Sequence, residues 1–279
     1  MFANDIQKLS EVSEKKIQYM RNSPFGYLLL SALAGIYLGF GITLIFSIGG
    51  PIAQAGGGPF LKLIMGACFG IALSLVIFAG SELFTGNNMV FAVGRLSGKV
   101  GIPAIVLIFV LCYIGNFFGS VFLGWLVVKG GSLTGDSRDL ILKVAAVKMN
   151  LSAGEGFLRG ILCNWLVCLA VWMSTRTNSD SAKLILIFWC LFAFIASGFE
   201  HSIANQSLLS MAMFLPHGPE ISFAGLMHNQ LFVTVGNIVG GGIMVGTVYW
   251  FSTTDAGKRE TENGAELPVA NVYDRTPGR

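Results

Sequence analysis

Two glutamates interrupt long apolar stretches of this sequence in the same local frame. A Gly-Ser-Glu run ends at Glu82 and is followed by Asn87, and a Gly-Phe-Glu run ends at Glu200 and is followed by Asn205. A carboxylate at bilayer depth costs about 2.5–3.5 kcal/mol on insertion scales, so it normally faces a protein interior or a water-filled path. A matched pair of glycine-broken segments is typical of a duplicated transporter or channel. We expect each glutamate to accept hydrogen bonds at its break or to pair with a cation, with the asparagine as a partner.

His201 directly follows the second glutamate and is the residue best suited to exchange a proton. Histidine changes charge near neutral pH, although a histidine in an apolar helix is more often a satisfied core residue. The break favours a functional role, because a path would be lined there. Lys148 supplies a positive charge that would attract an anion, or else is an ordinary loop lysine. Asn164 and Asn237 lie in apolar stretches, where bonding between helices is the common role of asparagine.

Large apolar side chains gather around both breaks, and they are Phe69, Leu73, Leu83, Phe84 and Phe194. Apolar rings narrow a pore and block hydrated ions, whereas plain packing is the alternative for each of them. The sequence contains no metal-ligand spacing, nucleotide-binding loop or hydrolase triad, and no long basic run that would favour nucleic acid. It therefore predicts neither an enzyme, nor a bound cofactor, nor a nucleic-acid partner.

The elements that would hold these residues are membrane-spanning helices. Apolar residues make up 53% of the chain and charged residues only 12%, against about 25% charged in a soluble domain. A spanning helix needs about 20 mostly apolar residues. The apolar runs predict six spans at 26–48, 61–79 resuming at 86–94, 100–128, 156–175, 182–197 resuming to 214, and 224–251. The first span is expected to end at the Gly-Gly-Pro run before Ile52, and 129–153 to be a polar connection.

The charge distribution indicates how the rest of the chain is placed. Residues 1–22 mix charged and apolar side chains at helical spacing, which predicts an amphipathic helix on the membrane surface or a solvated leader packed under the bundle. Residues 23–252 are predicted to form the six-span transporter domain, and the polar residues 253–279 are predicted to be disordered. Six spans put both termini on one side. That side carries the larger share of Lys and Arg, so both termini are expected in the cytoplasm.

The two halves of the apolar region match beyond the glutamates. The third span contains Gly-Asn-x-x-Gly at Asn116, and the sixth contains the same motif at Asn237. Because each half holds three spans, an odd number, the second copy enters the membrane upside down. The sequence therefore predicts an all-α membrane protein built from two inverted three-helix repeats, with the second and fifth helices broken.

Four motifs in order resemble the formate/nitrite transporter family, over residues 20–252. They are GSELFTG at 80–86, CNWLVCLAVWM at 163–173, SGFEHSIAN at 197–205 and GNIVGG at 236–241. The nitrite channel branch is favoured by Ser81 and Glu82, where formate channels tend to have Ala-Asp. The resemblance implies an aquaporin-like fold, a homopentamer with one pore per protomer, and a place among the lipids of the bacterial inner membrane.

The same resemblance assigns a place to each candidate residue. The cytoplasmic constriction of the family is matched by Leu73, Leu83, Phe84 and Thr85, and the periplasmic constriction by Phe69 and Phe194. The central chamber is matched by His201, Lys148, Asn164 and Asn237. The remaining candidates are expected to brace the breaks, and they are Glu82, Glu200, Asn87 and Asn205.

A transport hypothesis follows from these assignments. Nitrite is drawn in by Lys148 and by helix-end dipoles, acquires a proton at His201 and passes the apolar constriction as a neutral acid, guided by Thr85, Asn164 and Asn237. A channel for formate or hydrosulfide would use the same residues, and a proton-coupled carrier is the alternative to a channel. A membrane enzyme or sensor is the distant alternative.

Overall fold

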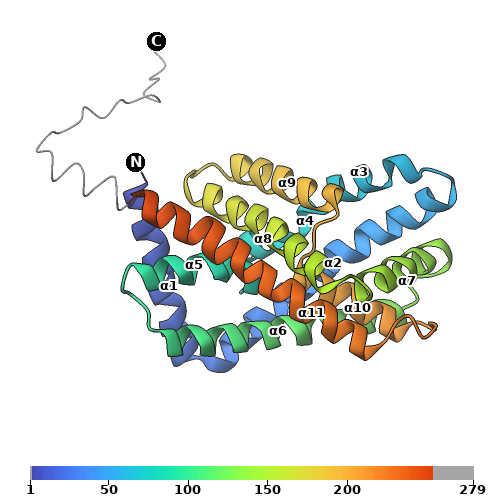
Figure 1. The fold of residues 1–279 in the computed structure, drawn as a ribbon, viewed down its shortest axis with the longest axis horizontal. Helices are drawn as coiled ribbons and strands as arrows, with labels where there is room; N and C mark the ends of the chain where they lie inside the picture. The colour runs from blue at the N-terminus through green and yellow to red at the C-terminus, as the bar shows by residue number, and fades with distance from the viewer. Residues whose placement is uncertain (1, 254–279) are drawn as a thin grey trace, which may run out of the picture.

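Helices form all of the regular secondary structure between residues 2 and 253, the part of the chain that the computed structural model describes (Figure 1). In chain order they are α1 (Ala3–Asn22), α2 (Pro24–Gln54), α3 (Gly58–Cys68), α4 (Gly70–Leu75), η1 (Val76–Gly80), α5 (Phe84–Leu96), α6 (Ile102–Lys129), α7 (Gly135–Met149), α8 (Ala153–Thr175), α9 (Asp180–Ser197), α10 (Ser202–Phe214), α11 (Phe223–Ile238) and η2 (Val239–Thr247). The π-helices η1 and η2 interrupt otherwise α-helical spans. The predicted disordered tail, except for its first residue, lies outside the described residues.

Six of these stretches are long and apolar enough to cross a membrane, which confirms the predicted six-span architecture. The second span, Gly58–Gly80, comprises α3, α4 and η1 and resumes after a break as α5. The fifth span is α9, which resumes after a break as α10. Figure 1 shows α1 and the end of the sixth span at the same end of the bundle. The chain is a multi-pass membrane protein.

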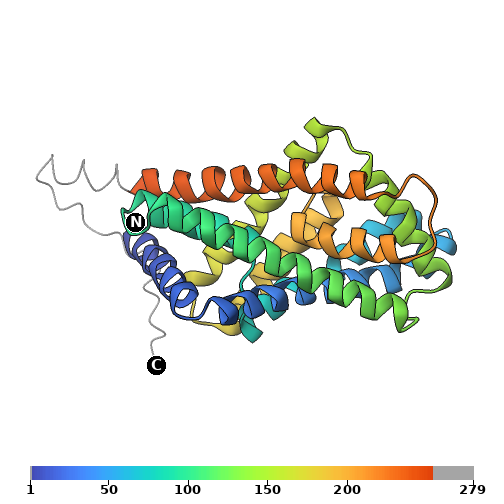
Figure 2. The ribbon, with the colours of Figure 1, turned by 90° about the horizontal axis from the view of Figure 1, so that it is seen from below.

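The two repeats interlock, so that each break is covered by helices of both. Within the first repeat α2 packs along α6, and within the second α8 packs along α11. The half-helix α10 of the second repeat packs on α6 of the first, and α5 of the first packs on η2 of the second. In Figure 2 the short α10 lies between the long helices α6 and α11.

Glycines let the paired long helices approach closely. A Cβ on Gly119 of α6 would overlap the carbonyl oxygen of Ala32 on α2, and a Cβ on Gly236 of α11 would overlap that of Phe157 on α8. Membrane helices associate through such close backbone approach, because lipid supplies no hydrophobic force between them. The Gly-Asn-x-x-Gly motif therefore serves packing in both repeats.

One predicted boundary is wrong, and one predicted connection contains a helix that was not predicted. The helix α2 continues through Pro51 to Gln54 instead of ending at the Gly-Gly-Pro run. Proline cannot donate to the carbonyl four residues earlier, but the carbonyl of Ser47 accepts from the hydroxyl of Ser137 at 3.4 Å instead. The expected polar connection 129–153 contains a further helix, α7, which packs against α2. Its residues are too polar for a membrane span, so a search for apolar runs passes over it.

Candidate functional site

Both breaks begin at a glycine in the left-handed conformation. Gly80 has a φ of 82° and Gly198 has a φ of 72°. This conformation costs an L-residue about 1–2 kcal/mol, whereas glycine adopts it readily. The glycine of each Gly-x-Glu frame is therefore required by the backbone conformation, because it turns the chain out of the helix and places the glutamate in the break.

At the first break, three donors hold the carboxylate of Glu82. Lys16 Nζ, from α1, lies 2.6 Å from both carboxylate oxygens. The hydroxyl of Tyr27 and the amide of Asn87 each donate to Oε2 at 3.1 Å. The backbone N–H of Glu82 donates to the carbonyl of Leu30 at 3.2 Å, which joins the break to α2. Both the side chain and the backbone of Glu82 thus brace the break.

At the second break, Glu200 is held in the equivalent way and is 3% exposed. Lys148 Nζ, from α7, lies 2.8 Å from both carboxylate oxygens, and Asn205 donates at 2.6 Å. Asn229 accepts from Asn205 at 3.0 Å and donates to the carbonyl of Lys148 at 2.9 Å. The positive charge of Lys148, which the sequence suggested as an anion attractor, is therefore compensated by Glu200.

Asn237 and Asn116 fasten the two breaks to their repeats. Asn237 donates to the carbonyls of Gly160 and Glu200 at 2.8 and 2.9 Å, and accepts from the backbone N–H of Ser202 at 2.8 Å. Asn116 makes the equivalent three bonds at 2.7, 2.8 and 3.0 Å. Asn237 has no N–H left for a permeating anion, so the expectation that it guides the substrate is not supported by this geometry.

The centre of the molecule holds a contact between the two repeats. His201 Nε2, from the second break, lies 3.0 Å from Thr85 Oγ1, from the first. Asn164 donates to the carbonyls of Thr85 and Asn237 at 3.1 and 2.7 Å, so it fixes Thr85 relative to the second repeat. The ring of Phe194 stacks on His201 with centroids 5.9 Å apart.

Hydrogen bonding determines which nitrogen of His201 carries the proton. Nδ1 lies 3.1 Å from the backbone nitrogen of Ala204 and accepts from it, so His201 caps the N-terminus of α10. In the neutral ring the proton is then on Nε2, which donates to Thr85. A proton can occupy Nδ1 only if the cap to Ala204 opens.

Three cavities lie in sequence through the molecule. The Lys148 vestibule has about 200 Å³ and is lined by Lys62, Lys148, Phe194, Gly198 and His201, among others. The central cavity has about 10 Å³ and is lined by Leu38, Phe69, Leu73, Leu83, Val167, Leu191, Phe194 and His201. The Lys16 vestibule has about 770 Å³ and is lined by Lys16, Leu73, Val76, Glu82 and Leu83, among others.

Shared lining residues give these cavities their order. Phe194 and His201 line both the Lys148 vestibule and the central cavity. Leu73 and Leu83 line both the central cavity and the Lys16 vestibule. A water needs about 10–15 Å³, so the central cavity is at the limit for a single water molecule. The structure is a path with two wide mouths and a closed apolar neck.

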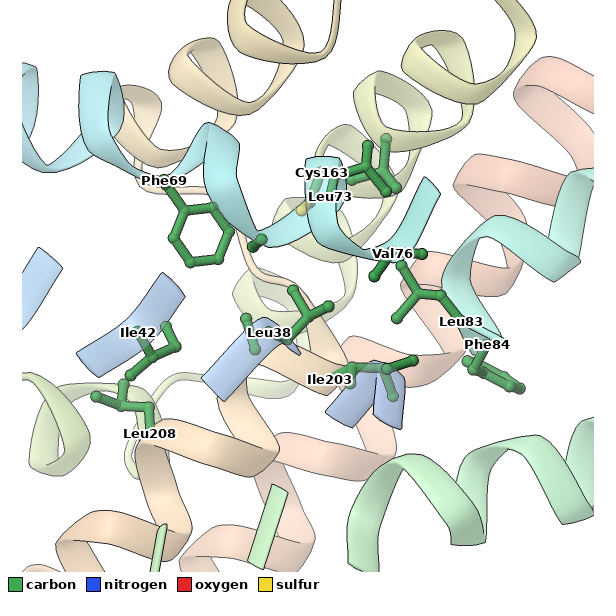
Figure 3. Packing of buried hydrophobic residues seen from close by; sticks show 14 of the residues in the cluster. Leu38, Ile42, Phe69, Leu73, Val76, Leu83, Phe84, Cys163, Ile203 and Leu208 are labelled. Atoms are coloured by element: carbon green, nitrogen blue, oxygen red, sulfur yellow. The ribbon is translucent and has the colours of Figure 1, made fainter. Parts of the chain in front are cut away.

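The neck is lined by four of the predicted constriction residues, Phe69, Leu73, Leu83 and Phe194, but by neither Phe84 nor Thr85. Figure 3 shows Leu83 pointing toward Val76 and Phe84 pointing away from them. The Phe84 ring packs edge-on against Phe109 and Tyr113 of α6, with centroids 5.3 and 5.1 Å apart. Phe84 therefore lines no part of the central cavity, because consecutive residues at the start of α5 face opposite ways.

Several residues of the site were not singled out from the sequence. Leu38, Val167 and Leu191 line the central cavity but look like any apolar residue of a spanning helix. Lys16 lies in the charged N-terminal segment, far along the chain from Glu82, so no local pattern connects the two. A search for a cation to pair with each carboxylate in the breaks would have pointed toward the lysines of this segment.

Six spans, two inverted repeats with broken helices and a closed path between two vestibules define a membrane channel or transporter. The family model for the formate/nitrite transporter matches residues 3–251, and the chain belongs to this family. It is 41% identical over 277 residues to the nitrite transporter NirC of Escherichia coli (strain K12), covering 99% of this chain and 98% of the relative.

Two solved structures share the fold over most of the chain. An FNT family ion channel superimposes with a TM-score of 0.86 at 42% identity, covering 90% of this chain and 99% of the other. A pentameric formate channel with formate bound superimposes with a TM-score of 0.75 at 28% identity, covering 84% of this chain and 99% of the other. The relatives are transporters and channels.

Proposed function

We propose that the protein is a nitrite channel that moves this small weak-acid anion in both directions across the bacterial inner membrane, with both termini in the cytoplasm. Support comes from the similarity to the nitrite transporter NirC along nearly the whole chain. The observation that carries the proposal is the neck itself, an apolar cavity in whose lining His201 is the polar side chain, with Thr85 bonded to it from behind.

The neck favours a neutral species over an ion. An anion that loses its water in an apolar passage suffers a far larger cost than a neutral acid of the same size. Nitrite therefore takes up a proton at or before His201, passes Leu73 and Leu83 as nitrous acid, and releases the proton in the opposite vestibule. In the capped state, His201 Nε2–H donates to an oxygen of the permeant in place of Thr85 Oγ1. Donation of a proton by His201 itself requires the Ala204 cap to open first.

Formate is the second candidate substrate. A pentameric formate channel has the same fold, and formate is also a monovalent weak acid small enough for the same neck. We further propose that five copies of this chain assemble, each with its own path. Large apolar side chains on the outer faces of α6 and α11 would contact lipid or neighbouring subunits.

Anion flux into proteoliposomes tests the substrate. With purified protein, we expect nitrite uptake well above that of protein-free vesicles, and weaker inhibition of it by formate or hydrosulfide than by unlabelled nitrite. Formate uptake without nitrite uptake would overturn the proposal. A flux that saturates with anion concentration and depends on an imposed proton gradient would indicate a carrier. A flux that does not saturate would indicate a channel.

A further inference from the structure

We propose that Lys62 is the anion-capture residue of the Lys148 vestibule and forms the first binding subsite for a small monovalent anion. The inference rests on the proposed function, and it assigns the attracting charge to a different residue from the one that the sequence suggested. Lys62 lies on α3, and its side chain lines the same cavity as Lys148 and His201.

The position of Lys62 puts its charge close to the second break. Its Nζ lies 3.7 Å from the place that a Cβ on Gly198 would occupy, and Gly198 begins the break that holds Glu200 and His201. The cavity that Lys62 lines extends to His201, so an anion held there is already in the vestibule that leads to the neck.

The charges around the vestibule single out Lys62. Lys148 makes a two-oxygen ion pair with Glu200, which is buried behind the cavity wall, so their charges largely cancel. Between residues 2 and 253, Lys62 has neither an ion pair nor a hydrogen bond, and its charge is uncompensated. In the Lys16 vestibule, by contrast, the lining lysine and the lining carboxylate of Glu82 are paired with each other. The two mouths therefore differ, and among residues 2–253 it is the Lys148 vestibule that presents a free positive charge.

The exposed side chain suits transient capture of an anion. Lys62 is exposed, and a lysine ammonium is a compact charge on a flexible stem that keeps most of its water. Such a site raises the local concentration of anions without holding them tightly, and its effect weakens as salt screens it. The competing explanation is that Lys62 only complements the carbonyl dipoles at the C-terminal end of α9. That role stabilises the fold and has no effect on flux.

Initial rates of anion uptake into proteoliposomes at low and high ionic strength test the inference. We expect Lys62→Gln to lower nitrite uptake about two- to fivefold at low ionic strength, and the difference from the unsubstituted protein to vanish at about 1 M salt. Lys62→Glu should lower uptake further, and Lys62→Arg should retain it. Lys129→Gln is the matched control, because it removes an exposed lysine at the end of α6 that lines none of the three cavities.

Equal uptake by Lys62→Gln and the unsubstituted protein at low ionic strength would overturn the inference, as would an equal loss in Lys129→Gln. If the Lys62→Gln protein cannot be purified, Lys62→Cys is purified and labelled with a cationic or an anionic thiol reagent. The inference then requires that the cationic label restores uptake and that the anionic label does not. Because the attraction depends only on the charge of the anion, formate uptake should respond to the Lys62 substitutions in the same way as nitrite uptake. A protein that carries formate but not nitrite would therefore overturn the proposed substrate and still test Lys62.

Discussion

At the residue scale, the glutamates of the two breaks hold the backbone in place. Glu200 takes two bonds from Lys148 and one from Asn205, and its own carbonyl accepts from Asn237. A buried ion pair contributes little compared with a well-packed apolar pair, but the loss of one partner leaves an uncompensated charge. The stability of the second break therefore depends on both members of the Lys148–Glu200 pair.

Glu200→Gln should lower the free energy of unfolding by about 3–5 kcal/mol, because it leaves Lys148 charged and without its carboxylate. Denaturant unfolding in detergent measures this loss. The double variant Glu200→Gln with Lys148→Met should recover most of it. Glu220→Gln, at an exposed position in the loop before α11, is the control with the same change of charge. An equal effect of both glutamine substitutions would contradict the brace.

At the element scale, the left-handed glycines convert single helices into broken ones. Gly198→Ala should destabilise the protein by about 1–2 kcal/mol, since φ of 72° is unfavourable for alanine. Gly80→Ala tests the first break in the same way, and no atom lies within 4 Å of the added Cβ, so the cost is purely conformational. Gly154→Ala, which also meets no atom within 4 Å and has no positive φ, should be neutral or stabilising. A loss in Gly154→Ala equal to those at the breaks would contradict the argument.

The helix α1 is held at both ends. Near its start, Arg176 bonds Asp5 at 3.3 Å and lies 4.7 Å above the ring of Phe2, and near its end Lys16 binds Glu82. Arg176→Gln should therefore raise the rate of amide hydrogen exchange in the first turns of α1 about fivefold, which corresponds to a loss of roughly 1 kcal/mol of local stability. Arg138→Gln, in an exposed pair on α7, should leave that exchange unchanged. Unchanged exchange in both variants would show that the packing of α1 alone holds it.

The sequence predicts the helices and their breaks better than it predicts which side chains contact each other. Apolar runs and the repeated Gly-x-Glu frame locate the spans and both breaks, because length, hydropathy and glycine are local properties. The missed helix α7 is polar, and the extension of α2 through Pro51 depends on a hydroxyl from Ser137. The pairing of Lys16 with Glu82 and the outward direction of Phe84 arise only when distant helices pack.

At the scale of the whole molecule, the outer surface is apolar and the charge lies inside or at the ends. Phe118 is 61% exposed on α6, Trp189 is 60% exposed on α9 and Leu231 is 59% exposed on α11. In water such faces would associate, whereas in a membrane they contact lipid or other subunits. We expect the purified protein to form particles of five chains in mild detergent, as measured by native mass spectrometry. A stable monomer under those conditions would contradict the proposed assembly.

The pH dependence of nitrite flux in His201 variants tests the central claim most directly. His201→Asn keeps a side chain that can cap α10, so it separates the cap from proton exchange, whereas His201→Phe removes both. In proteoliposomes we predict that unsubstituted protein carries more nitrite as the pH falls, and that His201→Asn lowers the flux at least about tenfold and flattens this dependence. Unchanged flux with unchanged pH dependence in His201→Asn would contradict the account.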